Sequence, residues 1–185
     1  MQAMKNASSL YTPSAFWDQL VTKHMEELVR DGFSNFKRTV NMRYFNWGII
    51  GIVRHQLAPV FRRWISKPDL SPFISQFSDY HLGNSSKAKS FNAVTATIYK
   101  IYVAMLADFV ADSDKLGLLD KVTEPEIGNP FVVKHRGRQV SQDLCNSIHE
   151  FYNSTAACDI SKPGFRIAEL GAGYGRLGYV YLSAL

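Results

Sequence analysis

Apolar side chains recur every three or four residues along much of the chain, and this spacing predicts helices. In residues 12–33, Ser14 can cap the start of a helix and Gly32 can end it. A second helix is predicted from about Trp47 to Ile65, disturbed near Pro59. The strongest signal lies in residues 89–117. Its apolar stripe is interpreted as core packing and comprises Val94, Ile98, Ile101, Tyr102, Met105, Leu106, Phe109 and Val110.

The pattern changes after residue 122. Residues 123–131, TEPEIGNPF, are rich in Pro, Gly and Asn and predict a loop. Residues 131–140 alternate around Arg136-Gly137, which is typical of a short hairpin. Ser141 then suits the start of another helix, because its hydroxyl can accept a backbone N–H bond. The apolar face of that helix would carry Leu144, Ile148, Phe151 and Tyr152.

A linker, DISKPG, leads into the apolar run FRIAEL at residues 165–170, which is predicted to be a short strand. Directly after it, Glu169, Gly171, Gly173 and Gly175 stand at E-x-G-x-G-x-G spacing. Glycines at the carboxyl end of a strand let the backbone turn tightly and approach a ligand closely. The helix that follows directs its free N–H groups toward the same place. This pattern favours a nucleotide-type cofactor loop over a purely structural glycine turn.

The spacing of this loop fits two kinds of cofactor. GYGRLG, from Gly173 to Gly178, fits the dinucleotide fingerprint G-x-G-x-x-G. In that register neither Glu169 nor Gly171 has a role, whereas an acid two residues before the first glycine suits S-adenosylmethionine. The methyltransferase interpretation is therefore favoured, and a dinucleotide-linked oxidoreductase stays as the alternative.

RIAELGAGYGRLGYVYL, residues 166–182, resembles motif I of class I S-adenosylmethionine-dependent methyltransferases. More narrowly, it is similar to the sugar O-methyltransferase family, and EPEIGNPF and GRQVSQDLCNSIHEF upstream support that match. The resemblance implies a sugar or glycan acceptor and S-adenosyl-L-methionine as cofactor. It also implies which residues line the methionine end of the cofactor, with Gly175 supporting the turn: Glu169, Gly171, Ala172, Gly173 and Tyr174.

We therefore expect a helical N-terminal domain at residues 1–122, a connecting region at 123–163, and the first βα unit of a Rossmann-like α/β domain at 164–185. A lone parallel strand leaves its edges unpaired. The chain is accordingly expected to be the front part of a longer enzyme and inactive alone. A non-catalytic helical interaction module that lends its last strand to a partner is a further alternative.

The catalytic base is not assigned. The titratable candidates are His135, His149, Glu150 and Asp143. His135 is expected at a solvated hairpin turn and His149 on an ordinary helix surface or core edge. Asn129, Ser141 and Asp143 could reach a polar acceptor if their segments form a lid; otherwise these segments are a loop and a helix cap.

Composition and charge limit the class of protein. The chain has 185 residues, is 46% hydrophobic and carries a net charge of +5, which indicates a globular protein. The basic groups Lys37-Arg38, Arg62-Arg63 and residues 134–138 are interpreted as scattered solvated charge, so no nucleic acid partner is expected.

Cys145 and Cys158 have no metal-like spacing and are expected to be buried or partly buried thiols. No signal peptide is recognised, and residues 44–53 are too short to span a bilayer. A cytoplasmic location without membrane contact is expected.

Overall fold

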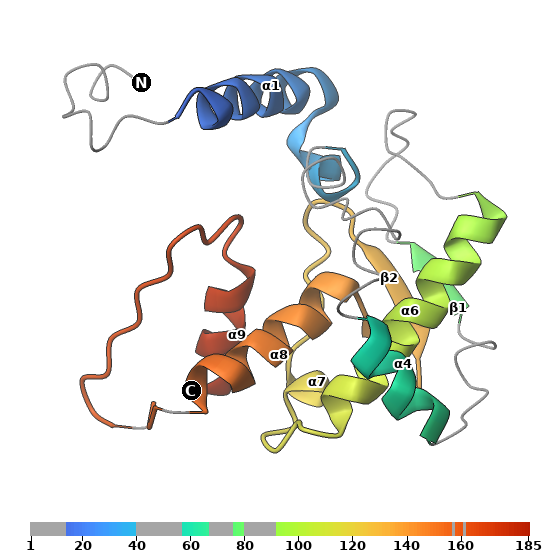
Figure 1. Ribbon diagram of the computed structural model, residues 1–185. Helices are drawn as coiled ribbons and strands as arrows, with labels where there is room; N and C mark the ends of the chain where they lie inside the picture. Colours follow the sequence, from blue (N-terminus) through green and yellow to red (C-terminus); the bar gives the residue numbers. More distant parts are fainter. Residues whose placement is uncertain (1–13, 40–56, 67–75, 80–91, 157, 161) are drawn as a thin grey trace.

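The computed structural model describes residues 14–39, 57–66, 76–79, 92–156, 158–160 and 162–185. This part of the chain is mainly helical and carries a small antiparallel sheet (Figure 1). In chain order the elements are α1 Ala15–Asp31, η3 Phe33–Arg38, α4 Leu57–Ser66, β1 Gln76–Asp79, α6 Ala93–Ala111, α7 Leu118–Lys121, β2 Phe131–His135, β3 Arg138–Val140, α8 Gln142–Thr155 and α9 Arg176–Ala184.

Helix α6 is the centre of the core. It packs against α4, α8 and the sheet, and every side chain from Tyr102 to Ala107 is buried. This half of the helix is therefore buried around its whole circumference, and not only along one apolar face. The expected core packing is confirmed here but is wrong at the start of the helix, where Val94 is 70% and Ile98 45% exposed. The hydrophobic cluster around α6 also takes in residues of α7, α8 and α9.

The hairpin at residues 131–140 is confirmed. Strands β2 and β3 pair antiparallel, and β1 pairs with the other edge of β2. Arg136 and Gly137 have φ values of 48° and 80°. Two consecutive residues with positive φ make a type I′ turn, whose twist matches that of the flanking strands. Strand β1 was not predicted from the sequence.

Helices α8 and α9 pack side by side near the C-terminus (Figure 1). Ser141 caps α8 as predicted, because its Oγ accepts a 3.0 Å hydrogen bond from the Leu144 N–H. Phe151 of α8 meets Tyr181 of α9 edge to face at 5.1 Å between ring centroids. The Tyr181 hydroxyl also lies 2.6 Å from the Ser154 hydroxyl.

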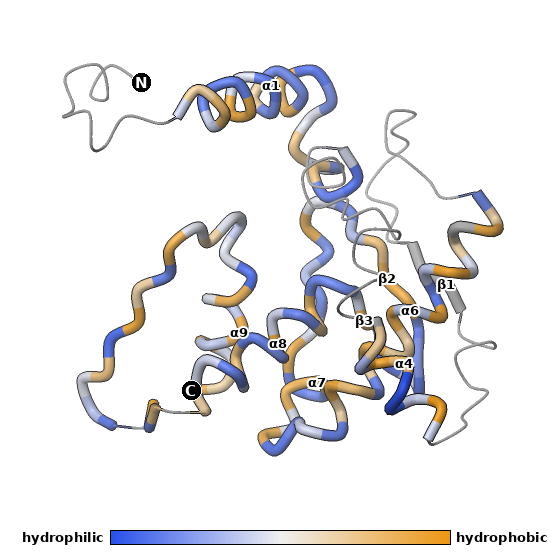
Figure 2. Tube along the Cα trace, viewed as in Figure 1, coloured by the Kyte–Doolittle hydropathy of each residue, from blue (hydrophilic) through white to orange (hydrophobic). Residues whose placement is uncertain are grey.

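The N-terminal helix α1 has the predicted caps. Ser14 accepts a hydrogen bond from the Trp17 N–H, and the Gly32 N–H donates to the Leu28 carbonyl. Figure 2 shows hydrophobic and hydrophilic positions alternating along α1. Several of its apolar side chains are exposed, among them Phe16 and Val29. Within the described residues, α1 packs mainly against η3.

The predicted helix near Pro59 begins at Leu57, so Pro59 lies in the first turn of α4, where proline is tolerated. The remainder of that prediction, residues 47–56, falls outside the described residues, as does the apolar stretch 44–53. Among the helices that the structure describes, none has the length and apolar character needed to cross a membrane.

The prediction of a strand at residues 165–170 is wrong. Residues 165–169 are irregular, and Phe165, Ile167 and Leu170 are exposed. None of the described strands pairs with this segment. An apolar run forms a stable strand only when a neighbour satisfies its backbone N–H and C=O groups. The helix predicted after the glycines does form, as α9, so only half of the expected βα unit is present.

Gly128 is expected to be sensitive to substitution because it has φ 83° and a Cβ there would lie 2.3 Å from the Phe36 ring. Gly137 has a similar φ of 80° but open space around it. Gly137→Ala should lower the free energy of unfolding by about 1–2 kcal/mol through backbone strain. Gly128→Ala should cost about 1–3 kcal/mol more, since Phe36 must move. Urea denaturation of both variants tests this, and equal losses would contradict the close packing.

Candidate functional site

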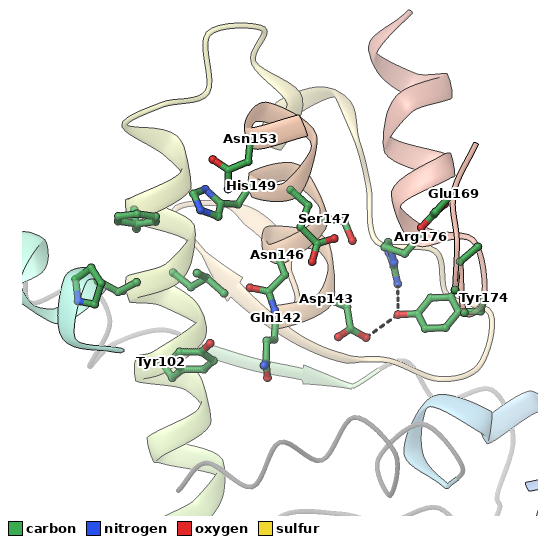
Figure 3. A pocket seen from close by; sticks show the side chains of 18 residues that line it. Tyr102, Gln142, Asp143, Asn146, Ser147, His149, Asn153, Glu169, Tyr174 and Arg176 are labelled. Carbon is green, nitrogen blue, oxygen red and sulfur yellow. Dashed lines mark hydrogen bonds between the residues drawn. The ribbon is translucent and has the colours of Figure 1, made fainter. Parts of the chain in front are cut away.

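A cavity of about 610 Å³ lies between α6, α8, the start of α4 and the glycine loop, residues 169–175 (Figure 3). Its volume is in the range of small-molecule sites. The cavity is lined by Pro59, Val60, Tyr102, Leu106, Phe109, Gln142, Asp143, Asn146, Ser147, His149, Glu150, Asn153, Glu169, Gly171, Ala172, Gly173, Tyr174 and Arg176.

The glycine loop forms one wall of this cavity. Glu169, Gly171, Ala172, Gly173 and Tyr174 all line it, so the structure brings these predicted residues together. Gly175 does not line the cavity; it precedes α9 and has φ 82°, consistent with support of the turn. Gly171 and Gly173 have φ values of 77° and 58°, which L side chains rarely adopt. A Cβ at Gly171 would meet no atom within 4 Å, so its position leaves open space.

Helix α8 forms the facing wall with polar side chains alone. In the view of Figure 3, Gln142, Asn146, His149 and Asn153 lie on the side of α6, while Asp143 lies on the side of the glycine loop. These positions follow the helical spacing of three and four residues. The opposite face of α8 is buried in the core and carries Leu144, Cys145, Ile148 and Phe151. One helix thus supplies both the core and the cavity wall.

Carboxylates gather in the part of the cavity near the glycine loop. Asp143 and Glu150 of α8 and Glu169 of the loop all line it. The pKa of Glu150 is raised, chiefly by burial and further by the charges of Glu169 and Asp143. Three carboxylates thus make this part of the cavity acidic, and two of them, Glu150 and Glu169, are exposed to solvent.

Tyr174 links the glycine loop to α8. Its hydroxyl donates a 2.6 Å hydrogen bond to Asp143 Oδ2, and Arg176 Nη2 lies 3.4 Å from the same hydroxyl (Figure 3). Lys37 Nζ lies 5.3 Å from the centre of the Tyr174 ring, and Phe36 meets the ring edge to face. Burial raises the pKa of Tyr174, so the phenol stays protonated and keeps its donor role.

Arg176, immediately after the loop, is anchored by Glu124. The Glu124 carboxylate is completely buried and accepts from Arg176 through both oxygens, with 2.8 Å between Nη1 and Oε2. Lys37 Nζ donates to Oε1 at 2.9 Å, and the Ser141 hydroxyl donates to Oε2 at 2.5 Å. One carboxylate therefore joins η3, the loop before β2, the start of α8 and the start of α9.

Sequence reasoning missed this cluster. Glu124 and Arg176 stand in the two segments that carry the family resemblance, which was the available signal for their pairing, whereas nothing in the sequence pointed to Lys37. The interpretation of Lys37-Arg38 as solvated charge is wrong, because both side chains are buried. Arg38 donates to the carbonyl oxygens of Asn129 and Pro130.

Three of the other candidates lie away from the cavity. His135 is buried, and its Nε2 lies 3.0 Å from Asp108 Oδ1, so the expected solvated turn position is wrong. Asn129 is also buried and donates from Nδ2 to the side chain of Asn35. The Ser141 hydroxyl donates to Glu124 and accepts from the Leu144 N–H at the start of α8, which agrees with the interpretation as a helix cap.

His149 is the histidine that lines the cavity. It is half-buried, as expected for a core edge, and its ring meets Phe109 edge to face at 5.4 Å. Nδ1 is buried and has no hydrogen-bond partner among the described residues. Burial lowers the pKa of His149, because a charged imidazolium loses part of its solvation in this environment.

The cysteines differ from each other. Cys145 is buried as expected, and burial raises the pKa of its thiol, whereas Cys158 is exposed, contrary to expectation. Across the described part of the chain, no group of three or more His, Cys, Asp or Glu side chains could hold a metal ion.

Comparison with known proteins adds no relative: no model of a protein family, no curated protein and no solved structure matches the chain.

Glu124→Gln is expected to destabilise the protein strongly, because it leaves Lys37 and Arg176 buried beside a neutral amide. Breaking a buried ion pair in this way costs about 3–5 kcal/mol. Asp120→Asn is the matched control, since Asp120 pairs with Arg138 on the surface, where such a change costs less than about 1 kcal/mol. The free energies of unfolding in urea give the comparison. Similar losses in the two variants would show that the Glu124 cluster is not essential to the fold.

Proposed function

We propose that the protein is an S-adenosylmethionine-dependent O-methyltransferase that acts on a sugar hydroxyl. One observation carries the proposal: the glycine loop with Glu169 forms one wall of a cavity whose other wall presents Asp143 and Glu150. The motif on which the family resemblance rests therefore faces a space of ligand size. Methyl transfer needs such a space, because the acceptor oxygen must be aligned with the methyl group and water excluded.

The charge of the cavity supports this cofactor over a dinucleotide. S-adenosylmethionine carries a sulfonium and an ammonium group, and carboxylates stabilise both. A pyrophosphate would meet the same carboxylates as an anion. The cations beside the loop, Arg176 and Lys37, already contact the buried Glu124.

The residues present fit the cofactor in conformation as well as in charge. Gly171 and Gly173 hold the positive φ values that a tight loop requires, and Gly171 leaves open space beside the backbone. Glu169 would stabilise the positive charges of the methionine end, both the sulfonium and the ammonium group, together with the backbone from Gly171 to Tyr174. When bound, the cofactor supplies an electrophilic methyl group. The irregular backbone at residues 165–169 departs from the strand that precedes this loop in a Rossmann-like domain.

One observation favours the dinucleotide alternative. Helix α9 begins without a side-chain cap, so its first N–H groups are available to an anion. The interaction-module alternative is supported by the exposed apolar side chains of α1. Neither observation accounts for the acidic cavity beside the glycine loop.

Calorimetric titration of the product of the complete reading frame tests the cofactor. We expect saturable binding of S-adenosylmethionine and none of NAD. Gly171→Val should abolish binding, because its side chain would occupy the open space beside the loop. Gly117→Val is the matched control: Gly117 also has a positive φ, of 66°, with no atom within 4 Å of a Cβ, and does not line the cavity. Binding of NAD, or equal losses in both variants, would contradict the proposal.

A charge-neutral substitution of Glu169 tests the electrostatic argument separately. Glu169→Gln should weaken S-adenosylmethionine more than S-adenosylhomocysteine, which lacks the sulfonium charge. We expect the ratio of the two affinities to change by roughly tenfold, equivalent to about 1.4 kcal/mol. Glu126→Gln removes the same charge from an exposed position outside the cavity and should leave the ratio unchanged. An unchanged ratio in Glu169→Gln would show that Glu169 does not sense the sulfonium.

A further inference from the structure

The face of α8 that lines the cavity has two chemically different rows. The row nearer the glycine loop carries the carboxylates of Asp143 and Glu150, with Ser147 between them in the helical register. The row nearer α6 carries no carboxylate and comprises Gln142, Asn146, His149 and Asn153 (Figure 3). The two rows divide the cavity into an acidic part and a neutral polar part.

The neutral row suits a ligand with several hydroxyl groups. Each amide offers both donors and an acceptor, as a hydroxyl does, so each can satisfy a hydroxyl in either sense. The same part of the cavity is bounded by the rings of Tyr102 and Phe109, which offer flat apolar surface to the C–H face of a sugar ring. A solvated helix face more often carries Lys and Glu, and none of the four side chains in this row is of those types.

His149 stands in this row beside the acidic part. Its Nδ1 has no hydrogen-bond partner among the described residues, and its ring contacts Phe109. The other titratable groups that line the cavity are Tyr102 of α6, Asp143 and Glu150 of α8, and Glu169, Tyr174 and Arg176 of the loop region.

We propose that the row Gln142, Asn146, His149 and Asn153 is the acceptor-binding wall, and that His149 takes the proton of the hydroxyl that is methylated. This inference rests on the proposed function and assigns the two parts of the cavity to acceptor and cofactor. A ring nitrogen of His149 accepts the hydroxyl proton while the acceptor oxygen forms a bond to the methyl carbon of the sulfonium donor. The methyl–sulfur bond breaks, its electron pair stays on sulfur, and the imidazolium releases its proton to solvent.

The binding part is tested by saturation-transfer NMR on the product of the complete reading frame, saturated with S-adenosylhomocysteine. The probes are the methyl glycosides of glucose, galactose, mannose, fucose and rhamnose. At least one should show transfer, and Asn146→Ala should reduce its signal at least fivefold. Gln139→Ala, an amide on the exposed face of β3 outside the cavity, should leave the signal unchanged. No transfer from any glycoside, or equal effects of the two variants, would overturn the acceptor wall.

The proton-transfer part is tested with His149→Gln, which keeps a polar side chain but cannot take the proton at neutral pH. Glycoside transfer should persist while methylation of that glycoside falls by about 10²–10⁴-fold. In the wild type, the acidic limb of the rate profile should follow the His149 imidazole titration measured by NMR, below 6.5, and should vanish in the variant. An unchanged rate, or an unchanged acidic limb, would overturn the role of His149.

The outcome separates this inference from the proposed function. Calorimetry with S-adenosylhomocysteine is run on the same samples. If the cofactor product binds and no glycoside does, the acceptor wall fails and the cofactor assignment stands. If the cofactor product does not bind, the proposed function itself fails.

Discussion

The buried carboxylate of Glu124 holds together the segments that surround the glycine loop. A charge without solvent must be matched by opposite charge and by hydrogen bonds, or folding is strongly disfavoured. Arg176, Lys37 and Ser141 supply those partners from segments far apart in the sequence. Because each must reach the same few atoms, the starts of α8 and α9 and the helical turn η3 are fixed relative to one another. The position of the glycine loop follows directly, since Arg176 is the first residue after it.

This anchoring explains why the loop can form a cavity wall without the strand expected before it. Residues 165–169 contribute no sheet hydrogen bonds in the described structure, so the loop is held from its C-terminal side. Arg176 fixes α9, Tyr174 bonds to Asp143, and Tyr181 packs on Phe151. Side-chain contacts with α8 therefore hold the loop in place, whereas in a Rossmann-like domain a parallel strand would do so. As a result, α8 forms the opposite wall of the cavity.

Features set by a few neighbouring residues were predictable from the sequence. Ser14 and Ser141 cap helices, and Arg136-Gly137 turns a hairpin, because these choices depend on local backbone geometry. Features that require a distant partner were not. Lys37 was interpreted as solvated since its partner lies 87 residues away. His135 was placed at a solvated turn because nothing in the sequence shows that Asp108 on α6 lies beside it.

The same distinction applies to the proposed cofactor. Glycine spacing describes a backbone conformation, and that conformation suits any ligand that must approach a tight turn, so two registers remained possible. The charge around the loop is a tertiary property, because it depends on α8 placing Asp143 and Glu150 opposite Glu169. In the proposed function, this arrangement would stabilise a sulfonium and repel a pyrophosphate in either register of the glycines. The proposed choice of cofactor therefore rests on residues outside the motif. They lie on the polar face of α8, which could be assigned from the sequence either to solvent or to a site.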